Sequence, residues 1–382
     1  MRVLLAFFMF ILFCFGNEII VKDMRGVDVK IKQNLSNIAT IDDGFVESVM
    51  THLGVIDKVK VIGSWSMKRD YKYEYEKISG EKYTLRGWNV MKYLHPWLDE
   101  LPCINSAQGN IINYETLAKA IPELVILRVG DCTLRGSNKE ATQKTIQTIQ
   151  ALQIPLIVLH APRGADISSM KDELRVLGEI FNQKQKALDL FEYLNQTQTL
   201  IKQRTQNIKD KANVLYLGLN ASARKSGGVA SSWGVNTPES FILQNIVNAN
   251  NAFRGEGSGV VLNLEQIYAT NPDVIMLPTF HGYHPVDELL HSVDFTGLSE
   301  LNAVKNRRVY AMPWTPMNCA KRLEYPLDML IIAKAAYPEI FNDIKVHEYA
   351  LNFYKHVYNV DDETAKALLN EQILGWTIEL DF

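Results

Sequence analysis

The sequence is poor in cysteine and contains no closely spaced cysteine pair. Four cysteines occur in 382 residues, and no two of them form a CxxC motif. Thiolate metal sites and thioredoxin-like redox motifs are therefore not supported. If Cys14 is removed with a leader segment, Cys103, Cys132 and Cys319 remain, and they allow at most one disulfide. Cys103 with Cys132 is then the expected pair, because both fall in the first half of the chain.

Signatures of the common enzyme classes are also missing. The chain contains no GxSxG, HExxH, GxGxxG or Walker loop. We therefore expect a protein that is not an enzyme and that carries no resident cofactor. An enzyme on a two-lobed α/β frame, such as a metal chelatase or reductase, is a remote alternative.

The chain has no large excess of either charge. Its formal net charge is −3, which gives no support for binding to nucleic acid or to an anionic membrane surface. With 47% apolar and 22% charged residues, the composition is that of a folded globular protein. A chain of this length normally forms two domains, and we expect a monomer.

The first sixteen residues differ from the rest of the chain. Met1 and Arg2 precede an apolar run, 3–15, which is too short to span a bilayer permanently. One positive charge, an apolar segment and Gly16 at its end predict a secretory signal cleaved after Gly16. We therefore expect a periplasmic protein. Lipidation at Cys14 and a buried N-terminal strand are the alternatives.

No glycine or proline interrupts residues 179–217, and this stretch organises the chain. From 184 to about 208, apolar residues recur at helical spacing and form one stripe, comprising Ala187, Phe191, Leu194, Ile201 and Ile208. The pattern predicts one long helix that rigidly joins two lobes. An ordinary crossover helix is the alternative.

Short apolar strands alternate with helical segments on both sides of this helix. That order is typical of α/β lobes with parallel sheets. The segment 67–98 is unusually aromatic, and it is expected to be either a packed insertion or a flap over a ligand. The predicted organisation is a signal peptide (1–16), an N-terminal lobe (17–165), a linker with the long helix (166–211), a C-terminal lobe (212–345) and C-terminal helices (346–382).

Two phrases recur at matching places in the two halves. The first half has Asn-Tyr-Glu at 113–115 before Ile-Pro-Glu-Leu-Val-Ile at 121–126. The second has Asn-Leu-Glu at 263–265 before Asn-Pro-Asp-Val-Ile at 271–275. With the stretches 297–310 and 325–330, these phrases resemble the helical-backbone class of periplasmic substrate-binding proteins. That class serves ABC importers of ferric siderophores, haem, cobalamin and related metal chelates.

The resemblance implies two Rossmann-like lobes joined by a single long rigid helix, with the ligand in a cleft between them. It also implies that a glutamate on each lobe docks to the permease, a role that falls on Glu115 and Glu265. Two exposed helix carboxylates without a partner are the alternative. The segment 67–98 and the tail beyond 345 depart from the family pattern.

Ligands of open α/β sheets bind beyond the carboxyl ends of the strands, so residues that follow strands are the candidates. Arginines suit the oxygens of an anionic chelate, whereas a salt bridge within a loop is the structural alternative. The candidate arginines are Arg128, Arg163 and Arg224, together with Arg322, which precedes a helix and either borders the cleft or caps that helix.

Aromatic and histidine side chains complete the candidate ligand site. Tryptophans near strand ends offer flat apolar surface for a chelate, although core packing is an alternative. Histidine and tyrosine in one loop are possible contacts, and the histidines are possible ligands for iron or nickel. The residues are Trp65, Trp233 and Trp314 for stacking, and His281, Tyr283 and His284 in the loop, with His281 and His284 as the metal candidates.

These patterns favour a receptor that captures a metal chelate, with a ferric siderophore as the leading candidate. Receptors for a nickel chelate, for haem or cobalamin, or for an oxyanion such as molybdate are the alternatives.

Overall fold

The computed structural model describes residues 18–87, 90–105, 111–131, 133–134, 136, 138–161, 166–279, 282–314 and 322–382. The side chain of Trp65 is not described. The expected signal segment, Arg163 and His281 lie outside the described residues, as do Cys132 and Cys319.

The first lobe is built on a four-stranded parallel sheet in the order β4-β3-β7-β8. Its central strand β7 has the sequence LVILRV, and every residue of it is buried, as expected for a parallel sheet covered on both faces. The strands are β3 (Ile38–Ile41), β4 (Val59–Ile62), β7 (Leu124–Val129) and β8 (Leu156–His160). The helices are α1 (Phe45–Leu53), α4 (Tyr114–Ala120), α5 (Lys139–Ala151) and α6 (Met170–Ile180).

The second lobe repeats this plan with a parallel sheet in the order β11-β9-β13-β14. Its strands are β9 (Asn213–Tyr216), β11 (Asn250–Asn251), β13 (Val274–Leu277) and β14 (Val309–Ala311). A small antiparallel pair, β10 (Ala230–Ser232) with β12 (Val260–Leu262), is added. The helices are α8 (Ala221–Lys225), α9 (Pro238–Phe241), α10 (Leu264–Thr270), α11 (Val286–His291), α12 (Asn302–Lys305) and α13 (Tyr325–Ala336).

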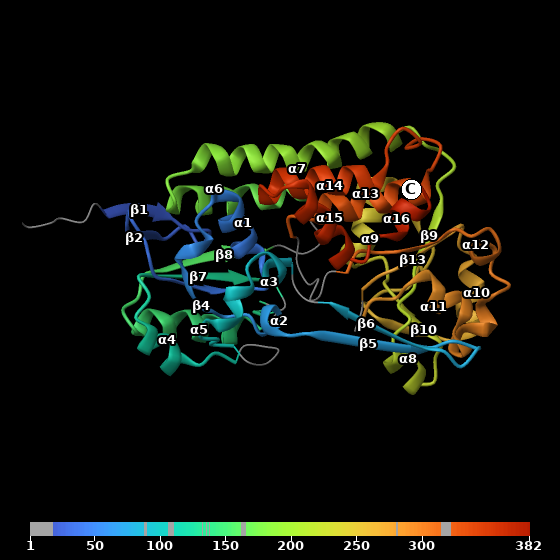
Figure 1. Cartoon of the computed structure of the whole chain (residues 1–382), viewed down its shortest axis with the longest axis horizontal. Coiled ribbons are helices and arrows are strands. Elements are labelled where there is room, and N and C mark those ends of the chain that lie inside the picture. The colour runs from blue at the N-terminus through green and yellow to red at the C-terminus, as the bar shows by residue number, and fades with distance from the viewer. Residues whose placement is uncertain are drawn as a thin grey trace, which may run out of the picture.

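The long helix α7 (Lys184–Thr205) joins the two lobes along one edge of the molecule (Figure 1). Its 22 residues span about 33 Å at 1.5 Å per residue. Ala187, Phe191, Leu194 and Ile201 are all buried, so the apolar stripe faces the protein. The predicted fold, two α/β lobes with parallel sheets and one connecting helix, is confirmed, although α7 ends before Ile208.

Three C-terminal helices, α14 (Val346–Tyr358), α15 (Asp362–Glu371) and α16 (Trp376–Glu379), lie beside α7 and α13 (Figure 1). The hydroxyl oxygens of Tyr349 on α14 and Thr197 on α7 lie 2.7 Å apart. The Nδ1 atom of His52 on α1 lies 2.8 Å from the carbonyl oxygen of Val357 on α14. Helix α14 therefore contacts both the long helix and the first lobe.

Two β-hairpins stand outside the sheets. The first is formed by β1 (Glu18–Lys22) with β2 (Asp28–Lys32), which pair in antiparallel fashion. The second, β5 (Tyr71–Glu76) with β6 (Lys82–Gly87), forms from the aromatic segment. The remaining short elements are α2 (Trp65–Lys68), α3 (Val90–Leu94), η1 (Ile56–Lys58), η2 (Pro96–Glu100), η3 (Ile167–Ser169), η4 (Ile242–Val247) and η5 (Val293–Leu298).

Among the described residues, no helix combines the length and the apolar character that crossing a membrane requires.

Candidate functional site

Three buried aspartates meet at the carboxyl ends of the first lobe's strands. Asp42 and Asp43 follow β3, Asp131 follows β7, and one carboxylate oxygen of each lies within 4.8 Å of the others. The carboxylate of Asp131 accepts the N–H groups of Asp43, Thr133 and Leu134 at 2.8–3.0 Å. Parallel strands end at the same edge of a sheet, which explains why residues far apart in sequence meet here.

Burial and neighbouring carboxylates raise the pKa values of acidic groups in this cluster. Burial, followed by the nearby charges of Asp43 and Asp42, raises the pKa of Asp131 well above its usual range. Burial and Asp42 likewise raise the pKa of Glu47. Carboxylate oxygens suit hard cations, so these aspartates are the described residues with the geometry to hold a metal ion. Backbone N–H groups already use part of their bonding capacity.

Arg128 is fully buried and binds carboxylates of its own lobe. Its Nε and Nη2 donate to the two oxygens of Glu173 at 2.7 and 3.1 Å, and Nη1 lies 3.8 Å from Asp43. The guanidinium carbon also lies 4.0 Å from the centre of the Phe45 ring. We expected Arg128 to face an anionic ligand, but in this conformation its guanidinium fork is filled by Glu173 on α6.

Arg322 connects the second lobe to this cluster. Its Nη2 lies 3.7 Å from Oδ2 of Asp43, and only 9% of the residue is exposed. Asp43 follows the first strand of the first sheet, whereas Arg322 lies between β14 and α13. The loops at the carboxyl ends of the two sheets are thus in contact, and Arg322 is one of the predicted site residues that lie at this junction.

Aromatic residues from both lobes form the adjoining part of the junction. Tyr71 of β5 meets Trp314, which follows β14, with ring centres 5.7 Å apart in a T-shaped pair. Within the described chain, the buried hydroxyl of Tyr71 and the buried Nε1 of Trp314 have no hydrogen-bond partner. Burial raises the pKa of Tyr71 to about 12. Tyr283 packs in the same cluster and donates its hydroxyl hydrogen to the carbonyl of Ile373 at 3.1 Å.

His284 is buried beneath the aromatic hairpin. Its Nδ1 lies 2.9 Å from Oε2 of Glu288, and the Tyr73 ring packs against the imidazole with centres 4.8 Å apart. A carboxylate on one ring nitrogen is the arrangement that metal-binding histidines commonly have. The residue is only 1% exposed, however, so the ring is closed to solvent in this structure.

Arg224 and Trp233 have contacts within the second lobe. Arg224 lies 2.8 Å from Asp294, donates to the carbonyl of Leu219 at 2.9 Å and lies over the Phe295 ring. Trp233 is 4% exposed and packs edge-on against Tyr216 in the core. The structure gives these two residues the alternative roles of a loop salt bridge and core packing.

Cys103 is a free thiol. Its Sγ lies 3.0 Å from the carbonyl oxygen of Asn105, and burial raises its pKa. The expected disulfide to Cys132 is therefore not formed in this structure.

Glu115 and Glu265 occupy equivalent positions on the two lobes. Each is exposed in the first turn of a short helix, α4 or α10, two residues after an asparagine cap. Asn113 and Asn263 accept backbone N–H groups at 3.0 and 2.8 Å, which explains the repeated Asn-x-Glu phrase as a helix start. Acidic residues also stabilise a helix N-terminus, and Glu115 pairs with Lys119 at 2.6 Å, so this placement does not distinguish docking residues from ordinary helix carboxylates.

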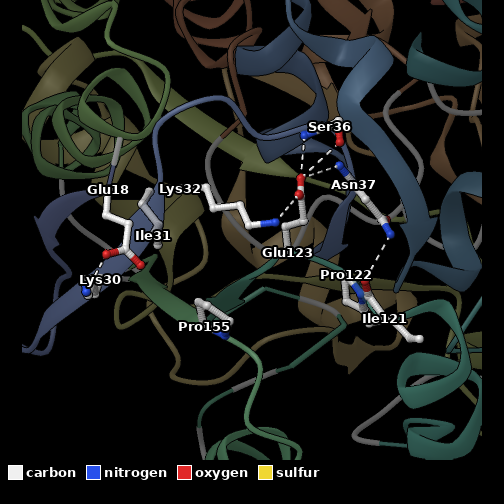
Figure 2. A pocket seen from close by; sticks show the side chains of 10 residues that line it. All are labelled: Glu18, Lys30, Ile31, Lys32, Ser36, Asn37, Ile121, Pro122, Glu123 and Pro155. Atoms are coloured by element: carbon white, nitrogen blue, oxygen red, sulfur yellow. Dashed lines mark hydrogen bonds and ion pairs between the residues drawn. The ribbon is translucent and has the colours of Figure 1, made fainter. Parts of the chain in front are cut away.

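A surface hollow of about 560 Å³ lies at the other, amino end of the first sheet (Figure 2). Glu123 accepts from Lys32 Nζ at 2.8 Å and from the N–H groups of Ser36 and Asn37 at 2.7 and 3.2 Å. The bond from Lys32, followed by that from the N–H of Ser36, lowers the pKa of Glu123 to about 2. These charges pair with one another, and the hollow lies away from the strand ends where ligands of such sheets bind.

Four residues of the junction were not predicted from the sequence. The consecutive aspartates after the strand at 37–41 were the available signal, because they occupy a strand end in the same way as the arginines. Tyr71 gave no comparable signal, since seven aromatics share its segment. The overlooked residues are Asp42, Asp43, Asp131 and Tyr71.

Comparison with known proteins supports the architecture. A family model described as periplasmic binding protein matches residues 50–315. No curated protein matches the sequence. A periplasmic solute-binding protein from Veillonella parvula superposes with a TM-score of 0.73 at 22% identity, covering 96% of this chain and 100% of the other.

Two further solved structures share the fold. CeuE from Helicobacter pylori with Ni(II) bound gives a TM-score of 0.63 at 20% identity, covering 92% of this chain and 99% of the other. MolA from Haemophilus influenzae bound to molybdate gives 0.64 at 18% identity, covering 90% and 98%. At these identities the likeness shows the fold alone.

Proposed function

Because this chain belongs to the periplasmic binding protein family, we propose that it is the receptor of an ABC importer. In this proposal it captures a metal chelate, a ferric siderophore first among the candidates, between its two lobes and delivers it to the permease. The leader at 1–16 directs it to the periplasm, where it works as a monomer. Glu115 and Glu265 are the proposed docking residues, since they are exposed at equivalent positions of the two lobes.

The contact between Asp43 and Arg322 is the observation that carries the proposal. It brings together the carboxyl-end loops of two parallel sheets, which is where ligands of such sheets bind. Beside it lie the Tyr71 hydroxyl and the Trp314 Nε1, two buried polar groups whose bonding capacity is unused within the described chain. Buried polar groups are normally hydrogen-bonded, so the pair supports a role in ligand contact.

We assign different roles to the two arginines of the junction. Arg322 contacts the ligand, because its guanidinium lies where the carboxyl-end loops of the two lobes meet. Arg128 sits behind Asp43 and holds the buried carboxylates of the first lobe in place. Arg163 and His281 also belong to the proposed site, since they follow β8 and β13 in sequence.

A nickel chelate is the second candidate, and His284 is the observation that favours it. Its imidazole is already oriented by Glu288, as in metal-binding histidines, and a protein of this fold binds Ni(II). Haem, cobalamin and molybdate are the remaining candidates, and other proteins of this fold bind haem and molybdate.

The test is native mass spectrometry of the protein isolated from its own cells, with metal analysis of the same sample. A bound organic mass carrying iron supports a siderophore receptor, and nickel supports the second candidate. Binding is then measured with a ferric siderophore, Ni(II)–histidine, haem, cobalamin and molybdate. No bound mass and no binding to any probe would refute the proposal.

Two matched variants test the site. Arg322→Gln should weaken binding of the active probe about tenfold or more, since it removes a charged hydrogen-bond donor. Arg224→Gln removes the same group from a place within the second lobe, and it should weaken binding less. Strong loss with the Arg224 variant and none with the Arg322 variant would move the site away from the junction.

A further inference from the structure

The hairpin of β5 and β6 makes a second connection between the lobes. It leaves the first lobe after β4 and α2 and ends against α11 of the second lobe. In Figure 1, α7 runs along the upper edge of the molecule and the hairpin along the lower edge. The two lobes are thus joined at opposite sides, by a continuous helix on one side and by non-covalent contacts on the other.

The two faces of the hairpin differ sharply in character. Tyr71, Tyr73 and Tyr75 are half-buried, whereas Lys72 and the other residues between them are exposed. Strand residues alternate between faces, so the aromatics share the face that meets the second lobe. The outer face carries charged and polar groups, which are Lys72, Glu74, Glu76, Lys82, Thr84 and Arg86.

The hairpin meets the second lobe through polar contacts to α11 and through the packing of Tyr71 and Leu85 against the cluster that contains Trp314. The hydroxyls of Tyr73 and Tyr75 donate to Glu288 at 2.5 Å and Asp287 at 2.9 Å. Lys77 lies 2.8 Å from Asp287.

The hairpin tip adds backbone contacts to the same lobe. The N–H of Ile78 donates to the carbonyl of His291 at 2.7 Å, and Lys77 forms an isolated antiparallel bridge with Ser292. Side chains and backbone of one short segment therefore fasten the tip to α11 and the residue after it.

We propose that this hairpin is a releasable clasp, which opens by detaching from α11 while both lobes stay folded and so controls access to the junction. The inference rests on the proposed function for its ligand, but the opening itself does not. The clasp covers His284 and contacts Trp314 through Tyr71, so its release exposes two candidate contact groups together.

The physical basis is a difference in stability between the clasp and the lobes. Every residue of β3 and β7 is buried, whereas every second residue of β5 and β6 is exposed. A two-stranded hairpin is marginal by itself in water, so the clasp depends on its contacts with α11. Segments with few buried apolar contacts open locally at lower free energy than the core.

The first test is amide hydrogen exchange on the ligand-free protein. The hairpin amides should exchange at least tenfold faster than those of β3 and β7. A Tyr73→Phe, Tyr75→Phe variant should speed hairpin exchange a further tenfold or more, because it removes two hydrogen bonds to carboxylates. Thr84→Ala, which removes a hydrogen bond on the outer face, is the control and should leave the rate within about twofold.

The second test locks the clasp with a disulfide between Lys77→Cys and Ser292→Cys, with the native cysteines replaced by serine. Directly opposite antiparallel residues have Cα atoms about 4.5–5.5 Å apart, within the range that a disulfide spans. The control is a disulfide between Glu74→Cys and Thr84→Cys, which links the two strands of the hairpin to each other. The probes are a ferric siderophore, Ni(II)–histidine, haem and molybdate.

The locked protein should bind and release its probe at least tenfold more slowly, and reduction should restore both rates. The control disulfide should change neither. Equal rates in locked and reduced protein, or hairpin amides that exchange only with the core, would overturn the clasp. If no probe binds the reduced protein, the access role fails together with the proposed function, while hydrogen exchange still decides whether the hairpin opens alone.

Discussion

Replacement of Arg128 by methionine tests whether this residue supports the first lobe or contacts the ligand. The guanidinium, fully buried, bonds both oxygens of Glu173 at 2.7 and 3.1 Å and lies 3.8 Å from Asp43. Methionine fills part of the volume but leaves two buried carboxylates without this cation. Breaking a buried ion pair by removing one partner costs about 3–5 kcal/mol. We expect a loss of that size in the free energy of unfolding.

Urea unfolding followed by circular dichroism measures the loss, with two variants for comparison. Arg128→Met combined with Glu173→Met removes the pair together and should recover much of the stability, because one buried charge fewer is left unpaired. Arg175→Met is the control, because Arg175 lies on α6, the helix that also carries Glu173. Arg175 is 31% exposed and pairs with Glu179 at 3.1 Å, so its loss should cost about 0.5 kcal/mol or less.

Two results would refute this reasoning. A loss below about 1 kcal/mol for Arg128→Met would show that the guanidinium does not sustain the buried carboxylates. Unchanged stability with lost ligand binding would return Arg128 to the ligand-contact role that its place in the sequence predicts.

Three further predictions concern charges elsewhere in the molecule. Lys32, together with backbone donors, lowers the pKa of Glu123 to about 2, so its contribution to stability is present above the unfolded pKa of about 4.3 and is lost as the pH falls toward 2. Glu123→Gln should reduce the change of the urea unfolding midpoint with pH between these values. An unchanged pH dependence would contradict the lowered pKa of Glu123. Burial raises the pKa of Asp328 to about 8, so stability should fall as the pH rises from about 3.9 to 8. Asp328→Asn should weaken this fall, and a variant with the same pH profile as the parent protein would argue against it. Glu115→Ala with Glu265→Ala should leave ligand binding intact and abolish uptake by whole cells, whereas normal uptake would remove the docking role.

The two-lobed fold was predictable from the sequence because its signals are local. Unbroken apolar runs such as that of β7 mark buried parallel strands, and the stripe on α7 repeats at helical spacing within one segment. The repeated phrases around Glu115 and Glu265 have a local cause too, since asparagine caps both helices. Such features depend only on residues a few positions away, so they can be predicted from the sequence alone.

The partners of the site residues depended on the tertiary structure. Arg128 lies near the end of β7, Arg224 follows β9 and Arg322 precedes α13, and the surrounding sequence does not show which partner each one has. Glu173, 45 residues away in the sequence, accepts hydrogen bonds from Arg128. Asp294 pairs with Arg224, and Arg322 lies beside Asp43 of the opposite lobe. A guanidinium binds whichever carboxylate the packing of distant helices brings near it.

The aromatic segment shows the same division within a single element. The alternation of aromatic and charged residues at 71–76 belongs to the sequence and is typical of a strand with one covered face. The residues that cover this face, on α11 and at Trp314, lie more than 200 residues further along the chain. Period-two alternation determines that one face will be buried, but only the packing of the two lobes decides what buries it.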